Sequence, residues 1–504
     1  MFLWIVVTGG IFSFIASMGI GANDAANAFA TSVGSKALTL RQACGLAVVF
    51  ETGGAILMGS HVTDTIRKGI ADYQCFEDYP ELLMYGCMWV IFSVASWLFI
   101  ASYFEMPVST THSCVGGMIG MTIALVGSDC VIWYKSTDNF PYIGGVSGIV
   151  LSWVLSPLFS GIISSIIYAT TRSLVLRRPY RSSRLNIIYP ILVGSTLLIN
   201  SFFIIYKGAK GLKLDKIDAG IAIAISFGIA INGAVLTIPL IPRIRKIVDK
   251  KFQRQIHYPT SPSNEITNHH NLNITEIGCN IVQNKKKLNI NSDKQLKVVT
   301  DLHINAEKFD PKIEEVFKYL QIFTACCDAF SHGANDVANS VGPFAAIYLI
   351  YKEQNTLSKK LDMEDDAYWI LGLGGIGIGL GLIIYGKKIL YAIGDKLCKI
   401  TPSRGTCIEL GSALVIITGS RLKIPLSTTH CQVGATIGVG LLENKSCFKK
   451  IEGVNWWILS KTAFGWIITC VIVGLTTGIL SAQGVYGPSS PDIVECNNNT
   501  INYY

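Results

Sequence analysis

Two stretches of this chain carry nearly the same seven residues, Gly21-Ala22-Asn23-Asp24-Ala25-Ala26-Asn27 and Gly333-Ala334-Asn335-Asp336-Val337-Ala338-Asn339. A second pair follows in the same order at similar spacing, Met106-Pro107-Val108-Ser109-Thr110-Thr111-His112 and Ile424-Pro425-Leu426-Ser427-Thr428-Thr429-His430. Chance is not a serious explanation for two motifs that recur together, once in each half. A duplicated apolar unit of this kind is typical of transporters with pseudo-symmetric halves.

The composition places these motifs in a membrane protein. Half of the 504 residues are apolar and 15% are charged, whereas soluble proteins carry about a quarter of charged residues. The formal charge of +8 comes from short runs of Lys and Arg between apolar segments, so we interpret these runs as topology signals rather than nucleic acid contacts. The 14 cysteines show no CxxC or Cys/His metal spacing, and we expect them to be small apolar residues in helices.

Long apolar segments predict an all-α integral membrane protein. A bilayer core needs about 20 apolar residues per helix, and about ten segments approach this: 2–20, 43–60, 83–103, 142–170, 186–206, 217–242, 316–331, 368–393, 406–420 and 454–483. Two further stretches, 108–127 and 426–442, are interrupted by polar residues and glycines. We interpret them as parts of two re-entrant helical hairpins near 104–127 and 421–442, because interrupted helices are tolerated only inside protein or along a cavity.

The repeat and the composition divide the chain into five parts. We predict a first transport repeat over 1–170, connecting transmembrane helices over 171–242, a second transport repeat over 316–487 and a short C-terminal tail over 488–504. Residues 243–315 are polar and rich in Asn and Ser, which predicts a disordered linker.

Basic loops predict the orientation in the membrane. Six Lys and Arg residues lie between 243 and 254, and five lie in the loop at 171–184. Lys and Arg concentrate in cytoplasmic loops, although the loop at 207–216, on the opposite face, carries four Lys. We therefore expect a cytoplasmic linker, extracellular termini and residence in the plasma membrane.

The first motif pair predicts cation sites. Asp24 and Asp336 lie in apolar surroundings, where a charge costs about 2.5–3.5 kcal/mol on insertion scales. Bound sodium would offset that cost twice, with Asn23 and Asn335 as oxygen ligands and the neighbouring glycines letting the helix unwind to present carbonyl groups. The alternative is an Asn-Asp pair that only joins helices through hydrogen bonds.

The second motif pair predicts an anion site. Ser or Thr suits a helix N-cap, and proline suits the first turn. Helix N-termini offer free N–H groups and a partial positive charge to oxyanions. Two such termini meeting in the membrane would surround a tetrahedral anion with neutral donors, from Ser109, Thr110, Thr111, Ser427, Thr428 and Thr429. The alternative is simple capping of two buried helices.

Other ionisable residues in apolar segments are further candidates. Glu51 and Glu409 are possible cation ligands, although the repeat does not relate them to one another. His332 precedes the second Gly-Ala-Asn-Asp motif, and His112 and His430 end the Ser-Thr-Thr-His motifs. A histidine in such a position is more often a packing residue than a metal ligand or proton shuttle, so we assign all three a supporting role.

The sequence resembles the inorganic phosphate transporter (PiT) family, solute carrier family 20. The resemblance rests on the two motif pairs and on Thr39-Leu40-Arg41-Gln42-Ala43, Glu51-Thr52-Gly53 and Thr65-Ile66-Arg67-Lys68-Gly69-Ile70. It covers nearly the whole chain except 243–315. It implies a homodimeric, all-helical carrier with inverted repeats and an elevator-like movement.

The resemblance also implies roles for the motif residues. The six Ser and Thr residues are expected to hold phosphate, and cation coupling is expected from Asn23, Asp24, Asn335, Asp336, Glu51 and Glu409. His332 matches a histidine of sodium-coupled members and so favours sodium over protons. Some relatives carry a Glu where this chain has Gly86-Cys87, which leaves the cation stoichiometry open.

These observations favour a sodium-coupled phosphate symporter without cofactors. A proton-coupled phosphate carrier is the alternative within the same class, and a sulfate carrier fits less well because sulfate has no proton to donate to Asp24 and Asp336. An intramembrane hydrolase using Ser109, His112 and Asp24 is a distant alternative, because no Gly-x-Ser-x-Gly elbow is present. A receptor or scaffold role for the linker is also open.

Overall fold

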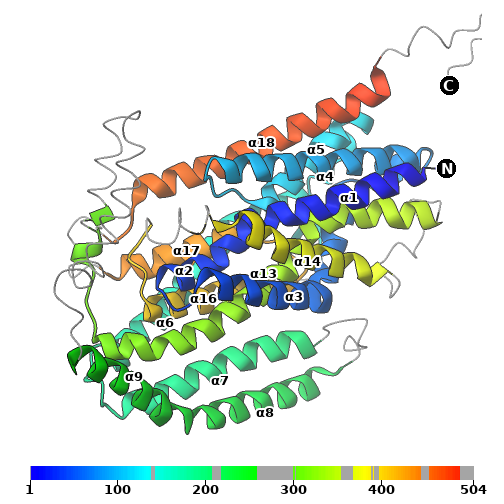
Figure 1. Ribbon diagram of the computed structural model, residues 1–504. Helices are drawn as coiled ribbons and strands as arrows, with labels where there is room; N and C mark the ends of the chain where they lie inside the picture. Colours follow the sequence, from blue (N-terminus) through cyan, green and yellow to red (C-terminus); the bar gives the residue numbers. More distant parts are fainter. Residues whose placement is uncertain are drawn as a thin grey trace, which may run out of the picture.

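The computed structural model describes residues 2–137, 142–206, 217–257, 299–300, 302–353, 367–387, 390, 397–443 and 453–487, without the side chains of Asn27 and of residues 255–257. The described chain is almost entirely helical (Figure 1). Its longer helices are α1 (Leu3–Ile20), α2 (Ala26–Gly34), α3 (Leu40–Lys68), α4 (Pro80–Tyr103), α5 (Thr110–Val126), α6 (Gly145–Thr171), α7 (Arg184–Ile205), α8 (Ala219–Thr237), α9 (Leu240–His257), α13 (Pro311–Glu353), α14 (Tyr368–Tyr385), α16 (Pro402–Arg421), α17 (Thr428–Leu441) and α18 (Trp456–Tyr486).

Short elements complete this architecture. Two π-helical turns, η1 (Gly21–Ala25) and η4 (Arg172–Leu176), continue α1 and α6. Two 3-10 turns, η2 (Tyr73–Phe76) and η3 (Ser128–Cys130), lie in loops. Strands β1 (Lys135–Ser136) and β2 (Ile143–Gly144) pair antiparallel, with Lys135 opposite Gly144.

Eight helical segments of the described chain are long and apolar enough to cross a membrane. This confirms an all-helical membrane protein. The predicted segments 316–331 and 406–420 also form helices, α13 and α16, but these helices are not among the eight, because their polar and charged residues lower the mean hydropathy. The predicted number of about ten crossings therefore stays a prediction.

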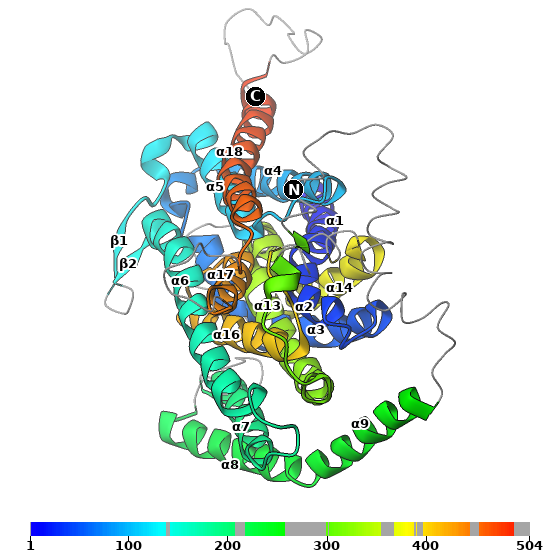
Figure 2. The ribbon, with the colours of Figure 1, turned by 90° about the vertical axis from the view of Figure 1, so that its left-hand side faces the viewer.

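The long helix α13 forms the centre of the molecule, with α3 and α16 packed along it (Figures 1 and 2). It is buried over most of its 43 residues. Glycine permits this packing. A Cβ at Gly333 would lie 2.2 Å from the carbonyl oxygen of Glu51 on α3, and one at Gly54 would lie 1.9 Å from that of Phe330 on α13. In the same way, a Cβ at Gly21 would lie 1.8 Å from the carbonyl oxygen of Ile378 on α14.

The expected unwinding at the Gly-Ala-Asn-Asp motifs is therefore wrong. The first copy forms the π-helical turn η1 between α1 and α2, and the second lies inside the uninterrupted α13. The backbone carbonyls stay within helical hydrogen bonding, and a π-turn only widens the helix by one residue. Both motif glycines allow close helix contact rather than chain opening.

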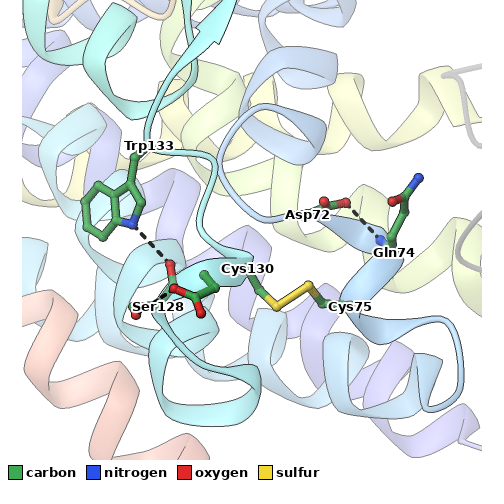
Figure 3. Close-up of a disulfide and its surroundings, with 7 residues drawn as sticks. Asp72, Gln74, Cys75, Ser128, Cys130 and Trp133 are labelled. Atoms are coloured by element: carbon green, nitrogen blue, oxygen red, sulfur yellow. Dashed lines mark hydrogen bonds between the residues drawn. A yellow bond between two sulfur atoms is a disulfide. The ribbon is translucent and has the colours of Figure 1, made fainter.

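In each of the helix pairs α4/α5 and α16/α17, a link joins the start of the first helix to the end of the second; we call this end of a pair its base. A disulfide links Cys75, before α4, to Cys130, after α5 (Figure 3). In the second pair, Arg404 near the start of α16 donates two hydrogen bonds of 2.8 Å to Glu443, just after α17. In each pair, the chain therefore enters and leaves at the base, and the turn that connects the two helices lies at the opposite end.

The disulfide corrects one expectation about the cysteines. Cys75 and Cys130 are not apolar helix residues, because the bridge between Ala71 and Val131 brings their loops together. The expectation holds for residues such as Cys87, Cys114 and Cys431, which are buried in helices.

The prediction of a disordered linker over 243–315 is wrong at both of its ends. Helix α9 covers 240–257 and turns away from the direction of α8 (Figure 2). Ile241 and Val248 are buried, and Lys251 pairs with Glu315 of α13 at 2.6 Å. The basic residues that lower the mean hydropathy here occupy one side of an amphipathic helix. Residues 258–298 of the predicted linker lie outside the described residues.

The end of the linker segment packs on the base of α16 and α17. Arg177 donates hydrogen bonds of 2.8 and 2.9 Å to Glu307, and these bonds lower the pKa of the Glu307 carboxyl. The carbonyl of Glu307 accepts a hydrogen bond from Arg404, and its N–H donates to Glu443. This segment therefore belongs to the ordered core.

The close contact at Gly333 makes a testable prediction. In Gly333→Ala the new methyl group collides with the backbone of α3, so we expect a loss of about 2 kcal/mol or more of folding free energy. Thermal unfolding in detergent measures it. The control is Gly45→Ala on α3, where a Cβ meets nothing within 4 Å. Equal melting temperatures for the two variants would contradict the packing argument.

Candidate functional site

The two Ser-Thr-Thr triplets begin the short helices α5 and α17. Ser109 and Ser427 are the N-caps, and each hydroxyl accepts the backbone N–H of the following histidine, His112 or His430. The expected place of the prolines in the first turn is wrong, because the serines take the cap position and Pro107 precedes its cap by two residues.

The two helix starts meet inside the protein. Ser109 Oγ lies 2.9 Å from Ser427 Oγ. Thr111 donates to the carbonyl of Leu426 at 2.9 Å, and Thr429 donates to that of Val108 at 3.4 Å. These last two contacts are equivalent under the repeat. In each of them, a threonine of one triplet donates to the backbone carbonyl of the residue that precedes the other triplet. The six hydroxyl residues are all buried.

The two motif aspartates contact both helix starts. Asp24 accepts the backbone N–H of Thr110 at 3.2 Å and the hydroxyl of Thr429 at 2.9 Å. Asp336 accepts the hydroxyl of Thr428 at 2.5 Å. Asp24, at 1% exposure, and Asp336, at 0%, are thus shielded from solvent beside the hydroxyls.

The motif asparagines hold the turns that precede the triplets. Asn23 donates to the carbonyl of Met106 at 3.0 Å, and its Oδ1 accepts the N–H of Val108 at 3.0 Å. Asn335 donates to the carbonyl of Leu426 at 2.8 Å. Both amides therefore fix the backbone at which α5 and α17 start.

Two serines that the sequence analysis missed complete these contacts. Asn23 donates to the hydroxyl of Ser102, and the hydroxyl of Ser420 donates to Asn335 Oδ1. Ser102 and Ser420 stand at the same distance before Pro107 and Pro425. The repeat thus already contained the signal for them.

A histidine links two of the predicted acids. His332 Nδ1 lies 2.8 Å from Glu51 Oε2, and His332 Nε2 lies 3.0 Å from Asp336 Oδ2. All three side chains are almost fully buried. The structure thus brings Glu51, from α3, to the aspartate of the second motif.

Glu409 lies in a different setting. Its two carboxylate oxygens accept four hydrogen bonds, none from a motif residue. The donors are Thr31, Ser32, Gln321 and Thr324. These hydrogen bonds join α2 and α13 to α16, which carries Glu409. None of them connects Glu409 to the Ser-Thr-Thr triplets. The sequence reasoning missed these donors because Ser, Thr and Gln in apolar helices carry no pattern.

His112 and His430 lie behind the serines. Their rings are 4.8 Å apart, and each packs on a tryptophan, Trp153 at 3.6 Å and Trp466 at 3.7 Å. His112 Nδ1 also bonds to Ser109 Oγ at 2.8 Å. This geometry suits the supporting role that the sequence predicts.

A small cavity adjoins Asp24. Its volume of about 10 Å³ has room for one water-sized particle. It is lined by Asp24, Ala28, Asp328, His332, Ser412, Ile416, Thr428 and Gln432. The sequence analysis did not select Asp328 or Gln432. No cluster of three His, Cys, Asp or Glu in the described ranges has the geometry of a metal site.

The arrangement combines neutral donors with carboxylates. Hydroxyl groups and helix N–H groups bind oxyanions, while carboxylate and hydroxyl oxygens bind hard cations. No Lys or Arg stands in either motif pair. The site therefore suits an anion together with a cation.

Comparison with known proteins agrees with this chemistry. Residues 20–477 match the family described as the phosphate transporter family. The chain is 31% identical to a putative phosphate permease of Thermococcus kodakarensis, over 95% of this chain and 97% of that protein. It is 26% identical to sodium-dependent phosphate transporter 1 of Mus musculus, over 96% of both chains. A solved structure titled "The sodium-dependent phosphate transporter" superposes with a TM-score of 0.73 at 28% identity, covering 96% of this chain and all of that one.

Proposed function

Since the chain belongs to the phosphate transporter family, we propose that it carries inorganic phosphate together with sodium across a membrane. It is a carrier and not an enzyme. The observation that carries the proposal is the contact between two hydroxyl-capped helix starts, Ser109 to Ser427, with the carboxylates of Asp24 and Asp336 beside them.

Phosphate binds between the two helix starts. The hydroxyls there bond to one another across the interface, as in the contact of Ser109 with Ser427. A phosphate ion would take over such bonds and move α5 and α17 apart. Its own O–H groups would donate to Asp24 and Asp336. The phosphate ligands are Ser109, Thr110, Thr111, Ser427, Thr428 and Thr429.

Sodium neutralises the carboxylates that would otherwise repel phosphate. Each ion then strengthens the binding of the other, which is coupling in the thermodynamic sense. Asp24 and Asp336 are the best supported ligands, because they touch the triplets directly. The amide oxygens of Asn23 and Asn335 already accept protein hydrogen bonds, so they support the site mainly by shaping its backbone.

The two glutamates differ in how they contribute. Glu51 acts through His332, which contacts Asp336. Glu409 accepts four protein donors, so direct sodium ligation would require their release. For Glu409 we therefore favour a role in holding α2 against α13 and α16.

Two re-entrant hairpins in inverted repeats would form this site. Helices α5 and α17 have 17 and 14 residues, fewer than the roughly 20 that span a bilayer. Each returns to the base of its partner, as the Cys75–Cys130 and Arg404–Glu443 links require. Figure 1 has α16 and α17 left of centre and α5 right of centre, which supports entry from opposite sides. The repeats would span 1–170 and 316–487, joined through 171–242.

The homodimer and the elevator-like movement follow from the family resemblance alone. We propose both on that ground.

We further propose that the linker side is cytoplasmic and that the chain resides in the plasma membrane. Helix α9 and its basic residues lie at the end of the molecule opposite to the start of α1 and the end of α18 (Figure 1). Helix α3 runs from α2 toward the end where α1 starts, so the loop with Cys75 lies there. Disulfides persist in oxidising compartments, which supports an external location for that end. The four Lys of 207–216 and residues 488–504 lie outside the described residues.

Thiol labelling tests this orientation. In Cys75→Ser the partner thiol of Cys130 is released, so we expect a membrane-impermeant maleimide added to intact cells to label it. The double variant Cys75→Ser/Cys130→Ser gives the background from other cysteines. Labelling of Cys75→Ser above that background only after permeabilisation would reverse the proposed orientation.

Uptake of radiolabelled phosphate into vesicles tests the function. We expect uptake to require an inward sodium gradient and to disappear when choline replaces sodium. Asp24→Asn and Asp336→Asn should each lower sodium-driven uptake by about 100-fold, at the upper end of ordinary coupling energies, at equal amounts of protein in the membrane.

Two outcomes would contradict this assignment. Uptake that persists in choline and rises as the external pH falls would identify proton coupling instead. Full sodium-driven uptake in either aspartate variant would remove that carboxylate from the coupling mechanism.

A further inference from the structure

The cavity beside Asp24, hereafter the Asp328 cavity, contains polar atoms that lack well-formed hydrogen bonds. Asp328 Oδ1, Ser412 Oγ and both polar atoms of the Gln432 side chain make no hydrogen bond of good geometry within the described chain, although the Ser412 hydroxyl lies near enough to the Asp328 carboxyl to interact with it. The three residues are 1%, 0% and 7% exposed. Buried polar atoms are nearly always hydrogen-bonded, so this concentration in one cavity indicates a missing ligand.

The charge of the cavity selects a cation. Two carboxylates line it, those of Asp328 and Asp24, and no Lys or Arg does. His332 is the one basic residue in the lining, and both of its nitrogens face other acids, Glu51 and Asp336. Buried carboxylates need compensation by a nearby positive charge, and the protein around this cavity supplies little.

The size of the cavity and the type of its ligand atoms further restrict which ion it can hold. About 10 Å³ accommodates one particle the size of a water molecule, which a dehydrated sodium ion does not exceed and a phosphate ion does. The remaining polar lining offers oxygen atoms from Ser412, Thr428 and Gln432. Oxygen ligands of this kind suit hard cations rather than soft metals.

The cavity lies between the two repeats, but the polar residues Asp328 and Gln432 that line it have no counterpart in the first repeat. Asp328 lies two helical turns before Asp336, and the matching position before Asp24 is Ala16. The residue that corresponds to Gln432 in the first Ser-Thr-Thr helix is Cys114. A ligand bound here therefore breaks the symmetry of the repeat.

We propose that the Asp328 cavity binds one sodium ion in addition to those held at the paired aspartates. Its ligands are the oxygens of Asp328, Ser412, Gln432 and Thr428, with Asp24 at its edge. Thr428 also donates to Asp336 and is one of the proposed phosphate ligands, so this ion and the phosphate would share one residue. The inference rests on the proposed sodium coupling, of which it names one ion.

Sodium binding without phosphate tests the proposal directly. The purified full-length protein is unfolded by heat in sodium chloride and in choline chloride. A ligand that binds only the folded state raises the melting temperature. We expect sodium to stabilise the wild type, to stabilise Asp328→Asn much less, and to stabilise Ser412→Ala to an intermediate extent.

The same variants are then assayed for phosphate uptake at increasing sodium concentration. We expect the half-saturating sodium concentration to rise about tenfold in Asp328→Asn and about threefold in Ser412→Ala, within the usual range of site coupling. The matched control is Ser481→Ala on α18, which also removes a buried hydroxyl without a partner but lies outside the cavity lining. It should retain wild-type sodium dependence.

The outcomes separate this inference from the proposed function. Wild-type uptake without sodium dependence would reject sodium coupling itself. Sodium-dependent wild-type uptake, with unchanged sodium half-saturation and unchanged sodium stabilisation in Asp328→Asn and Ser412→Ala, would reject the cavity site alone. If Asp328→Asn does not fold, the comparison of Ser412→Ala with Ser481→Ala tests the cavity site. Equal sodium dependence in these two variants would reject it, and a higher half-saturating sodium concentration in Ser412→Ala alone would support it.

Discussion

The structure depends on the meeting of two helix starts in a buried interior. A helix that begins inside a membrane protein leaves its first N–H groups without helical partners, and such groups are costly in an apolar medium. Here Ser109 and Ser427 cap the two helices, and the Asp24 carboxylate accepts a further N–H at Thr110. The same donors that must be satisfied for the fold are those that an oxyanion would satisfy. Both the stability of the fold and the binding of an anion therefore require acceptors for the same N–H and hydroxyl groups.

The surrounding contacts keep this arrangement in register. Motif glycines bring backbones within contact distance, Gly21 against α14 and Gly333 against α3, which places both aspartates on closely packed helices. The asparagines then clamp the turns before each triplet. The base of one helix pair is fixed by a disulfide and that of the other by a buried ion pair. A movement that opens the site must therefore carry each helix pair as a unit.

Much of this was readable from the sequence, because the motifs occur twice. The repeat predicted that both triplets begin helices, and apolar length predicted an all-helical membrane protein. Four features could not be predicted in this way. The disulfide depends on loop pairing that no motif records. The roles of the motif glycines depend on which backbone carbonyl of a neighbouring helix they contact. The helix α9 was hidden because mean composition does not register an amphipathic pattern. Asp328 was missed because it has no counterpart in the first half.

The central claim is that both triplets hold one phosphate jointly. Equilibrium binding of radiolabelled phosphate to the purified protein in saturating sodium measures this directly, for the wild type and for Thr110→Val and Thr428→Val. The account predicts one phosphate per chain in the wild type and a loss of nearly all binding in either variant, since each removes donors from the same site. Two phosphates per chain, with half of the sites surviving at wild-type affinity in each variant, would show two independent sites and contradict it.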